Sequence, residues 1–356
     1  MEAKLVERIR FSNNFYLHPQ FKEKILSIQK DIELPIIPIS QNVVKDDYLS
    51  TFGKLNLEEE FGSNDLCASN GRKLLDKHVF LAYDESFDLF QVLEGTGYLT
   101  CHSLILMDDD DYLASTCLSF RFYTRSKLLL EKNKSLSDAN LSGKTDADSL
   151  GEKDKIEAVF KEDYALDRNK FILSNIPNNC IIFIDGPLVG KQMTRFNNEL
   201  NSRLLEKSVI PIFVVKNSSS NLVTDNTSQL YGKYNSDMHW AHNLLKSGQR
   251  TNFFRYTDQT VRANSKVFCY MKPFGASPQR IEMHPDTYVM YKELIFQLME
   301  TIYYLYLIQG DTKNTQIRPI AIAEKFARES KKMYNLNDIM MDSLLQPTMN
   351  QARGFR

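Results

Sequence analysis

One short segment, Ile181–Leu188, constrains the fold of this chain more than any other, because four apolar residues are followed at once by Asp185 and a glycine. A β-branched apolar run of this length predicts a buried strand, and α/β sheets place their chemistry at the carboxyl ends of strands. The segment Val79–Ser86 repeats the design, with Asp84 after the apolar run. If the two strands are neighbours, their carboxylates need a cation between them, which predicts a divalent-metal site.

Composition sets broad limits on the function. The chain has 356 residues, 42% of them hydrophobic and 25% charged, which suits one large elaborated domain or two small ones. The net charge of −1 gives no overall basic field, so nucleic-acid binding would depend on local patches. Five scattered cysteines lack the paired spacing of a zinc site or a disulfide framework and are expected to be buried reduced thiols.

No segment predicts secretion or membrane insertion. Residues 1–30 carry charge throughout, without the apolar core and cleavage site of a signal peptide. The longest apolar stretch, Tyr288–Ile308, contains Lys292, Glu293 and Glu300, which would be costly in lipid, and we expect a core helix there. A cytoplasmic protein without a membrane partner is therefore expected.

Hydrophobic periodicity predicts the order of the elements. Amphipathic helices are expected in an N-terminal arm over residues 1–40, followed by polar loop up to Arg72. Residues 132–155, poor in apolar side chains, predict a mobile insertion, and residues 336–356 a C-terminal tail. The strands are expected at Val79–Leu93 (interrupted near Asp84–Ser86), Gly97–Met107, Leu113–Tyr123, up to Asp185, Val209–Val215 and Lys266–Lys272, and the helices at Ile156–Ile176, Lys191–Lys207, Asp237–Leu245, Pro285–Ile308 and Ala321–Tyr334.

The element order predicts a fold class. Short connections make the first three strands an antiparallel meander, and two strand-helix-strand crossovers then require parallel pairing. Three antiparallel strands followed by helix, strand, helix and strand is the order of a ribonuclease H-like core, an α/β fold with a mixed five-stranded sheet flanked by helices. An N-terminal helical arm and a C-terminal α/β elaboration are expected around it. In such a core the first and fourth strands are neighbours, which would bring Asp84 and Asp185 together.

Further acids for the site would come from helices. Two metal ions held by carboxylates can activate water and neutralise the leaving group of a phosphodiester. The helix before Asp185 offers several carboxylates, and the last helix offers Glu324. Each of these also fits a solvated helix face, and each strand aspartate also fits a turn or helix cap. The carboxylates of the helix before Asp185 are Glu157, Glu162, Asp163 and Asp167.

Substrate phosphates would need positively charged donors. Lys216 ends an apolar strand and precedes an asparagine and three serines, a cluster suited to phosphate but also to an ordinary loop. Three arginines lie near aromatic residues in the sequence, the mixture used to bind single strands. These candidates are Arg250, Arg255 and Arg280, with Tyr270 among the aromatic residues.

The chain resembles the NurA nuclease family, the partners of HerA-type hexameric ATPase translocases. Six short motifs between about residues 78 and 332 follow the order of that family, and we expect a NurA-like nuclease domain over residues 78–335. The motifs are Ala82–Ser86, Ile184–Leu188, Val214–Lys216, Asp237 with Leu244–Arg250, Phe268–Tyr270 with Arg280–Pro285, and Arg318–Pro319 with Ala323–Ala327.

The resemblance implies a ribonuclease H-like fold and a manganese-dependent DNA nuclease, with magnesium as the alternative ion. It implies 5′-to-3′ exonuclease or endonuclease activity, a homodimer docked on a HerA-like hexameric ATPase, and a role in DNA end processing or antiviral defence. By motif match, Asp84 and Asp185 take metal-ligand roles and Asp167 is placed as the helix carboxylate, with Glu324 as a further catalytic acid.

Three departures from the family pattern leave a second function open. Glu85 stands where glycine is usual, Asp167 is shorter than the usual glutamate, and Glu324 stands where aspartate or histidine is expected. The alternative is a catalytically degenerate adaptor that binds the ATPase or DNA. A ribonuclease or another phosphodiesterase on the same core is a third hypothesis, because a fold does not fix its substrate.

Overall fold

The computed structural model describes residues 20–21, 23–24, 53–108, 111–134, 136–138, 152–190, 193–258, 261, 264–275, 277–310, 315–343 and 345–349. The chain divides into residues 1–37 and 38–356, and the elements described below belong to the second unit. The helical arm expected over residues 1–40 lies almost wholly outside the described residues. Much of the insertion expected over residues 132–155 does so too.

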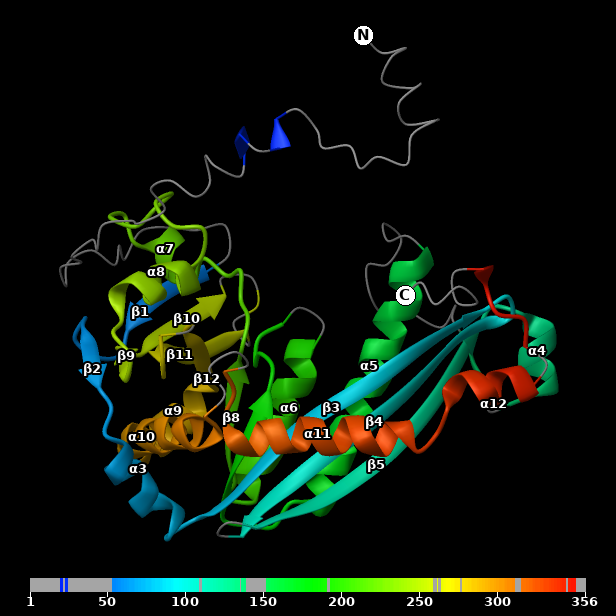
Figure 1. The fold of residues 1–356 in the computed structure, drawn as a ribbon, viewed down its shortest axis with the longest axis horizontal. Coiled ribbons are helices and arrows are strands. Elements are labelled where there is room, and N and C mark those ends of the chain that lie inside the picture. Colours follow the sequence, from blue (N-terminus) through cyan, green and yellow to red (C-terminus); the bar gives the residue numbers. More distant parts are fainter. Residues whose placement is uncertain are drawn as a thin grey trace. The chain divides into compact units, whose positions relative to one another are not determined.

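A single mixed sheet organises the second unit (Figure 1). The described strands follow the order β1-β10-β11-β12-β8-β7-β3-β4-β5-β6, with β9 joining β11 to β2. The strands are β1 Gly53–Leu57, β2 Ser63–Asp65, β3 Val79–Val92, β4 Gly95–Asp108, β5 Asp111–Thr124, β6 Ser137–Asp138, β7 Cys180–Asp185, β8 Ile210–Val215, β9 Gln249–Thr251, β10 Phe254–Asp258, β11 Ser265–Lys272 and β12 Gln279–Met283.

Helices cover both faces of this sheet. In Figure 1, α11 crosses one face of the long strands β3 and β4, and α5 and α6 lie on the opposite face. The helices are α3 Ala68–Leu75, α4 Lys127–Lys132, α5 Glu152–Asn175, α6 Thr194–Glu206, α7 Leu222–Asn226, α8 Asp237–Leu244, α9 Pro285–Met290, α10 Lys292–Gln309, α11 Arg318–Lys332 and α12 Leu336–Asp342.

The first three long strands form the predicted antiparallel meander. β3 pairs with β4 from Phe80–Met107 to Val92–Gly95, and β4 pairs with β5 from Thr96–Tyr123 to Asp108–Asp111. The interruption expected near Asp84–Ser86 is absent from β3, which runs unbroken for 14 residues. Asp84 therefore lies inside a strand, because pairing with β4 continues past the point where β7 stops.

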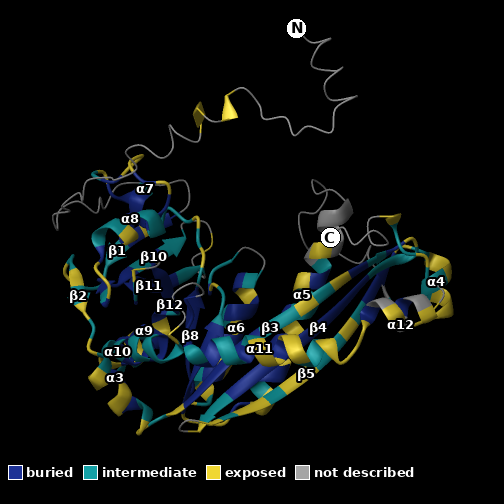
Figure 2. Ribbon diagram, viewed as in Figure 1, coloured by how far each residue is buried: buried dark blue, intermediate teal, exposed yellow. Residues whose placement is uncertain are grey.

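The strands β7 and β8 are parallel to β3 and to each other, as the crossovers predict. All six residues of β8 are buried, as are all residues of β7 except Asp185 (Figure 2). Helices on both faces explain why these strands are continuous apolar runs rather than alternating ones. The pairing of β3 with β7 confirms that the first and fourth strands of the core are neighbours.

Alternate residues of these strands enter two different cores. Phe80, Ala82 and Phe183 pack in a cluster with residues of α10 and α11. Tyr83 and Ile182 belong to a second cluster that contains residues of α5 and α6. Side chains alternate between the faces of a strand, so the face of each site residue follows from its position relative to these neighbours.

Several expectations about the periphery are corrected. The sheet is larger than five strands, because β12, β11, β10 and β1 extend it beyond β8. The segment before Arg72, expected to be loop, contains β1, β2 and the start of α3. The helix expected over Pro285–Ile308 is interrupted at Tyr291, between α9 and α10. The expected tail contains α12, whose Leu336 packs against Phe90 of β3.

Two further observations concern covalent and membrane features. The five cysteines are free thiols. Cys101, Cys180 and Cys269 are buried as expected, whereas Cys67 and Cys117 are exposed, so the expectation of burial was wrong for these two. Within the described part of the chain, none of the helices combines the length and apolar character that crossing a bilayer requires.

Candidate active site

Three polar side chains come to one face of the sheet because of strand alternation. Asp84 follows Ala82 by two residues, Asp185 follows Phe183, and Lys216 follows Val214. Ala82, Phe183 and Val214 all belong to the core under α10 and α11. The parallel register pairs Tyr83 with Ile184, so the two aspartates are the next residues on adjacent strands.

The ammonium of Lys216 lies among three carboxylates. Its Nζ is 3.1 Å from Asp185 Oδ2, 3.9 Å from Asp84 Oδ2 and 3.7 Å from Glu324 Oε2. Glu324 comes from α11, which packs across β3. Four segments far apart in the sequence therefore meet at one site, which we call the carboxylate–lysine site (Asp84, Asp185, Lys216 and Glu324).

Burial makes this charge arrangement costly. The Asp84 side chain is 6% exposed, and its Oδ1 accepts a hydrogen bond of 2.7 Å from the backbone N–H of Glu85. Burial, together with the charges of Asp185 and Glu85, raises the pKa of Asp84 to about 9. Burial also raises the pKa of Asp185, although Lys216 opposes the shift. Burial by itself would lower the pKa of Lys216, but the carboxylates outweigh it and raise that pKa.

Gln316 connects two members of the site, and sequence reasoning missed it. In the amide orientation that satisfies both groups, its oxygen accepts from Lys216 Nζ at 2.9 Å and its nitrogen donates to Glu324 Oε2 at 3.1 Å. Gln316 is 1% exposed. The other oxygen of Glu324 pairs with Arg328, one turn further along α11. A lone glutamine before a helix carries no sequence signal for this role.

A second buried charge network supports the loop after Asp185. Glu282 of β12 accepts hydrogen bonds from Lys266 Nζ at 2.5 Å and Arg280 Nε at 2.6 Å through one oxygen. Its other oxygen accepts from the backbone N–H of Leu188 at 2.8 Å. Leu188 lies three residues after Asp185, so this network fixes the path of the chain as it leaves β7.

The oxygen atoms of the site are donors of the kind that bind a divalent cation. Among the described residues, no three His, Cys, Asp or Glu side chains already surround a common metal position. Nevertheless, Asp84 Oδ2 is buried without a hydrogen-bond partner, and so is the hydroxyl of its cross-strand neighbour Ser103. The hydroxyl of Tyr306, whose pKa is raised by burial and by the charge of Asp185, is also buried and unpartnered. These three buried oxygens have no hydrogen-bond partner, and oxygen atoms of this kind are the ligands that a hard cation prefers.

The structure corrects the placement of Asp167. This residue lies on α5 and accepts hydrogen bonds from Arg121 Nε (3.0 Å), Arg121 Nη2 (2.9 Å) and Ser119 Oγ (3.0 Å), all from β5. Its neighbour Asp163 also contacts Arg121. The family motif placed Asp167 by order along the chain, whereas its position on α5 directs it to β5 and away from the carboxylate–lysine site.

The arginines expected to bind substrate are corrected as well. Arg250 and Arg280 are 5% and 4% exposed, and they pair with Glu59 and Glu282. Arg255 pairs with Glu58. Tyr270 is buried and donates its hydroxyl hydrogen bond to Asp237 Oδ2 at 3.0 Å. Core packing therefore accounts for Arg250 and Arg280, whereas Arg255 is only partly buried. Of the substrate-binding candidates, Lys216 alone joins the site.

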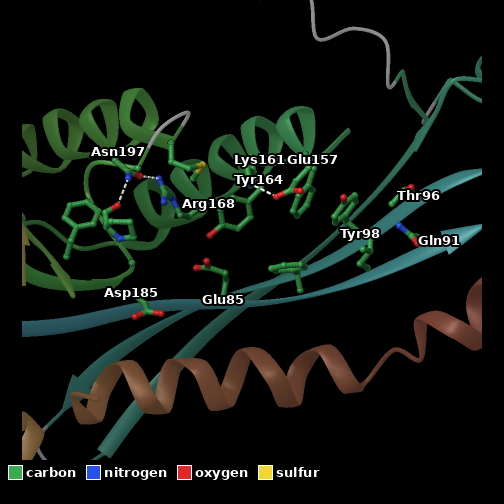
Figure 3. Close-up of a pocket in the computed structure, with 18 residues that line it drawn as sticks. Glu85, Gln91, Thr96, Tyr98, Glu157, Lys161, Tyr164, Arg168, Asp185 and Asn197 are labelled. Carbon is green, nitrogen blue, oxygen red and sulfur yellow. Dashed lines mark hydrogen bonds and ion pairs between the residues drawn. The ribbon is translucent and has the colours of Figure 1, made fainter. Parts of the chain in front are cut away.

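Glu85 points to the other face of β3. Figure 3 shows its side chain directed towards Tyr164 and Arg168 of α5, in a cavity that Asp185 also lines. Burial raises the pKa of Glu85, while Tyr164 and Arg168 oppose the shift. The glutamate that stands in the place of the family's glycine therefore lies behind the site rather than in it.

Comparison with solved structures gave several distant similarities. The NurA nuclease from Sulfolobus solfataricus is 12% identical, with 96% of this chain and 97% of that chain covered and a TM-score of 0.48. A second structure, described as NurA, is 8% identical over 90% and 96% of the two chains, with a TM-score of 0.39. Ciona intestinalis endonuclease V bound to inosine-containing DNA is 12% identical over 75% and 95%, with a TM-score of 0.37.

The family comparison was decisive. No curated protein matched the chain. The NurA domain family matched residues 114–329, which include Asp185, Lys216 and Glu324, while Asp84 precedes the matched region. This match spans more than half of the sequence, and the chain therefore belongs to the NurA family.

Proposed function

We propose that this protein is a divalent-metal-dependent nuclease that hydrolyses phosphodiester bonds of DNA at the carboxylate–lysine site. One observation carries the proposal: three carboxylates and a lysine from four separate segments converge where the parallel strands end. Membership of the NurA family supports the same reaction class.

Asp84 and Asp185 are the residues that would hold the ion, which we propose to be Mn²⁺, with Mg²⁺ as the alternative. Their side chains offer the hard oxygen ligands that such cations prefer, and Asp84 Oδ2 is buried without a hydrogen-bond partner. When bound, the ion would supply charge neutralisation at the phosphate and a more acidic water.

The other residues of the site prepare the phosphate position. Lys216 holds a positive charge beside the two aspartates and can pair with a phosphate oxygen of the substrate. Gln316 holds the ammonium of Lys216 and the carboxylate of Glu324 in fixed positions. Glu324, whose carboxyl group contacts Lys216 and Arg328, is available to orient a water molecule at the edge of the site.

A ribonuclease H-like core is the finer fold assignment that we propose. The segment β5-β4-β3-β7-β8 has three antiparallel strands followed by two parallel ones, with the first and fourth side by side. That order supports the assignment, and the remaining strands would then be elaborations at the outer edges.

Family membership also supports a proposal about partners. We propose that the protein forms a homodimer and works with a HerA-like hexameric ATPase in DNA end processing or antiviral defence. Residues 1–40 are proposed to contact that ATPase or the second protomer. Deleting residues 1–30 should then spare cleavage and weaken assembly, as measured by analytical ultracentrifugation of the mixture.

The decisive experiment compares cleavage of linear duplex and single-stranded DNA, with RNA alongside, in the presence of Mn²⁺. Asp185→Asn should abolish cleavage, because it removes one carboxylate of the pair. Asp286→Asn, whose side chain is 73% exposed on α9, is the matched control and should behave as wild type. Equal cleavage by wild type and Asp185→Asn would refute the proposal, and cleavage of RNA in preference to DNA would refute the substrate assignment.

A further inference from the structure

A cavity of about 520 Å³ lies on the face of β3 that α5 covers, opposite the carboxylate–lysine site (Figure 3). We propose that it accepts one unstacked nucleobase of a single-stranded substrate whose phosphodiester group lies at the carboxylate–lysine site. The proposal rests on the nuclease function proposed above and adds to it a binding site for the base.

The walls of the cavity offer flat aromatic surfaces. Phe160 of α5 stacks on Tyr98 of β4, with ring centroids 3.7 Å apart and planes within 12°. Phe87 of β3 lies 5.9 Å from Phe160 and is 54% exposed, an unusual position for a large apolar ring. Every nucleobase has a π-face that can stack on such a ring. Phe87 is therefore available for a base without rearrangement of the core.

The charged groups around the cavity favour a neutral ring over a phosphate. Lys161 is paired with Glu157 at 2.6 Å, and Arg168 donates to the side-chain oxygens of Asn169 and Asn197. These cations are thus already engaged, and Glu85 adds a carboxylate. Glu85 Oε2 is buried without a hydrogen-bond partner, so one polar group beside the cavity is unsatisfied.

The cavity and the carboxylate–lysine site share Asp185. The ladder between β3 and β7 ends at the pair Tyr83–Ile184, whereas β3 continues to Val92. Beyond β7 the two faces of the sheet therefore meet beside Asp185 and Gly186, which both line the cavity. A nucleotide at this edge can place its phosphate on one face and its base on the other.

The test measures binding separately from cleavage. Asp185→Asn protein without metal is titrated with short single-stranded DNA that contains 2-aminopurine, a base whose fluorescence falls when it stacks. We expect quenching on binding. In the same background, Phe87→Ala should weaken binding by roughly five- to a hundredfold and remove the quenching, as loss of one stacked base does. Phe120→Ala is the matched control, since Phe120 lies on β5, is 49% exposed and does not line the cavity.

The outcomes separate this proposal from the nuclease function. An abasic nucleotide at the quenched position should weaken binding to Asp185→Asn protein and leave binding to the Asp185→Asn, Phe87→Ala protein unchanged. Equal affinities of the Phe87→Ala and Phe120→Ala proteins, or absence of quenching, would overturn the base site even if wild type cleaves DNA. Failure of wild type to cleave, with quenching that depends on Phe87, would overturn the nuclease function and leave the base site standing.

Discussion

Replacing Glu282 by glutamine should destabilise the fold strongly. The Glu282 side chain is 0% exposed, and it receives hydrogen bonds from Lys266, Arg280 and the backbone of Leu188. Glutamine keeps the size but removes the negative charge, which leaves two cations, each 4% exposed, without a counter-ion. Breaking a buried ion pair costs about 3–5 kcal/mol, and we expect about 3 kcal/mol because glutamine retains one acceptor.

The pH dependence gives this prediction a second, independent readout. Burial alone would raise the pKa of Glu282, but Lys266 and Arg280 outweigh it and lower the pKa below the ordinary value of 4.5. A carboxyl whose pKa is lowered on folding contributes stability above the unfolded-state pKa and loses it as pH falls through the folded-state pKa. The stability difference between wild type and Glu282→Gln should therefore shrink as the pH is lowered below about 5.

The assay is urea unfolding at pH 7 and at stepped acidic pH, followed by circular dichroism and by the fluorescence of Trp240. Lys266→Met is the informative companion variant, because Arg280 still neutralises Glu282 and burial already lowers the pKa of Lys266 to about 8. It should cost about 1 kcal/mol. A loss below about 1 kcal/mol for Glu282→Gln, or a difference that does not shrink in acid, would refute the reasoning.

The remaining predictions concern the site and its surroundings. Asp84→Asn should abolish cleavage yet stabilise the metal-free protein by about 1–3 kcal/mol. The reason is that it removes a buried carboxyl group whose pKa of about 9 makes the folded protein bind a proton at neutral pH. Thermal melting in EDTA measures this change, and a destabilised variant would contradict it. Asp167→Asn should cleave at the wild-type rate per folded molecule, and its free energy of unfolding should fall by at most about 1 kcal/mol, since its partner Arg121 is partly exposed. Loss of cleavage with an intact fold would show that Asp167 belongs to the site. Gln316→Leu should lower kcat by about tenfold or more through misplacement of Lys216 and Glu324. Equal kcat values for wild type and Gln316→Leu would argue against this role.

The sequence was sufficient for the central strands and their chemistry because those features are local. Apolar runs that end in acid or lysine mark β7 and β8, and the short connections mark the meander. The order of elements then made β3 and β7 neighbours, as the structure confirms. The outer strands carried weaker signals. β1, β9 and β10 are three to five residues long, and strand pairing rather than sequence pattern sustains them: β1 pairs with β10, β10 with β11, and β9 with β11 and β2.

The carboxylates and arginines show where sequence reasoning stops. Residues two apart on a strand point to the same face of the sheet. Because Ala82 faces α10 and α11, Asp84 lies on that face as well. The sequence alone could not say which helix acid would join the two aspartates. Asp167 and Glu324 are both acids on amphipathic helices, and their separation depends on how α5 and α11 pack across the sheet.

The sequence by itself determined the two acid-bearing strands, their parallel adjacency and the lysine after β8, because these depend on hydrophobic period and element order. Tertiary structure alone decided that Glu324 and Gln316 reach Lys216, that the buried Arg250 and Arg280 pair with glutamates, and that an aromatic cavity opens behind Asp185. The physical reason is that charged side chains are placed by partners distant in the sequence, and the free energy of burying a charge favours whichever counter-ion the packing brings within reach.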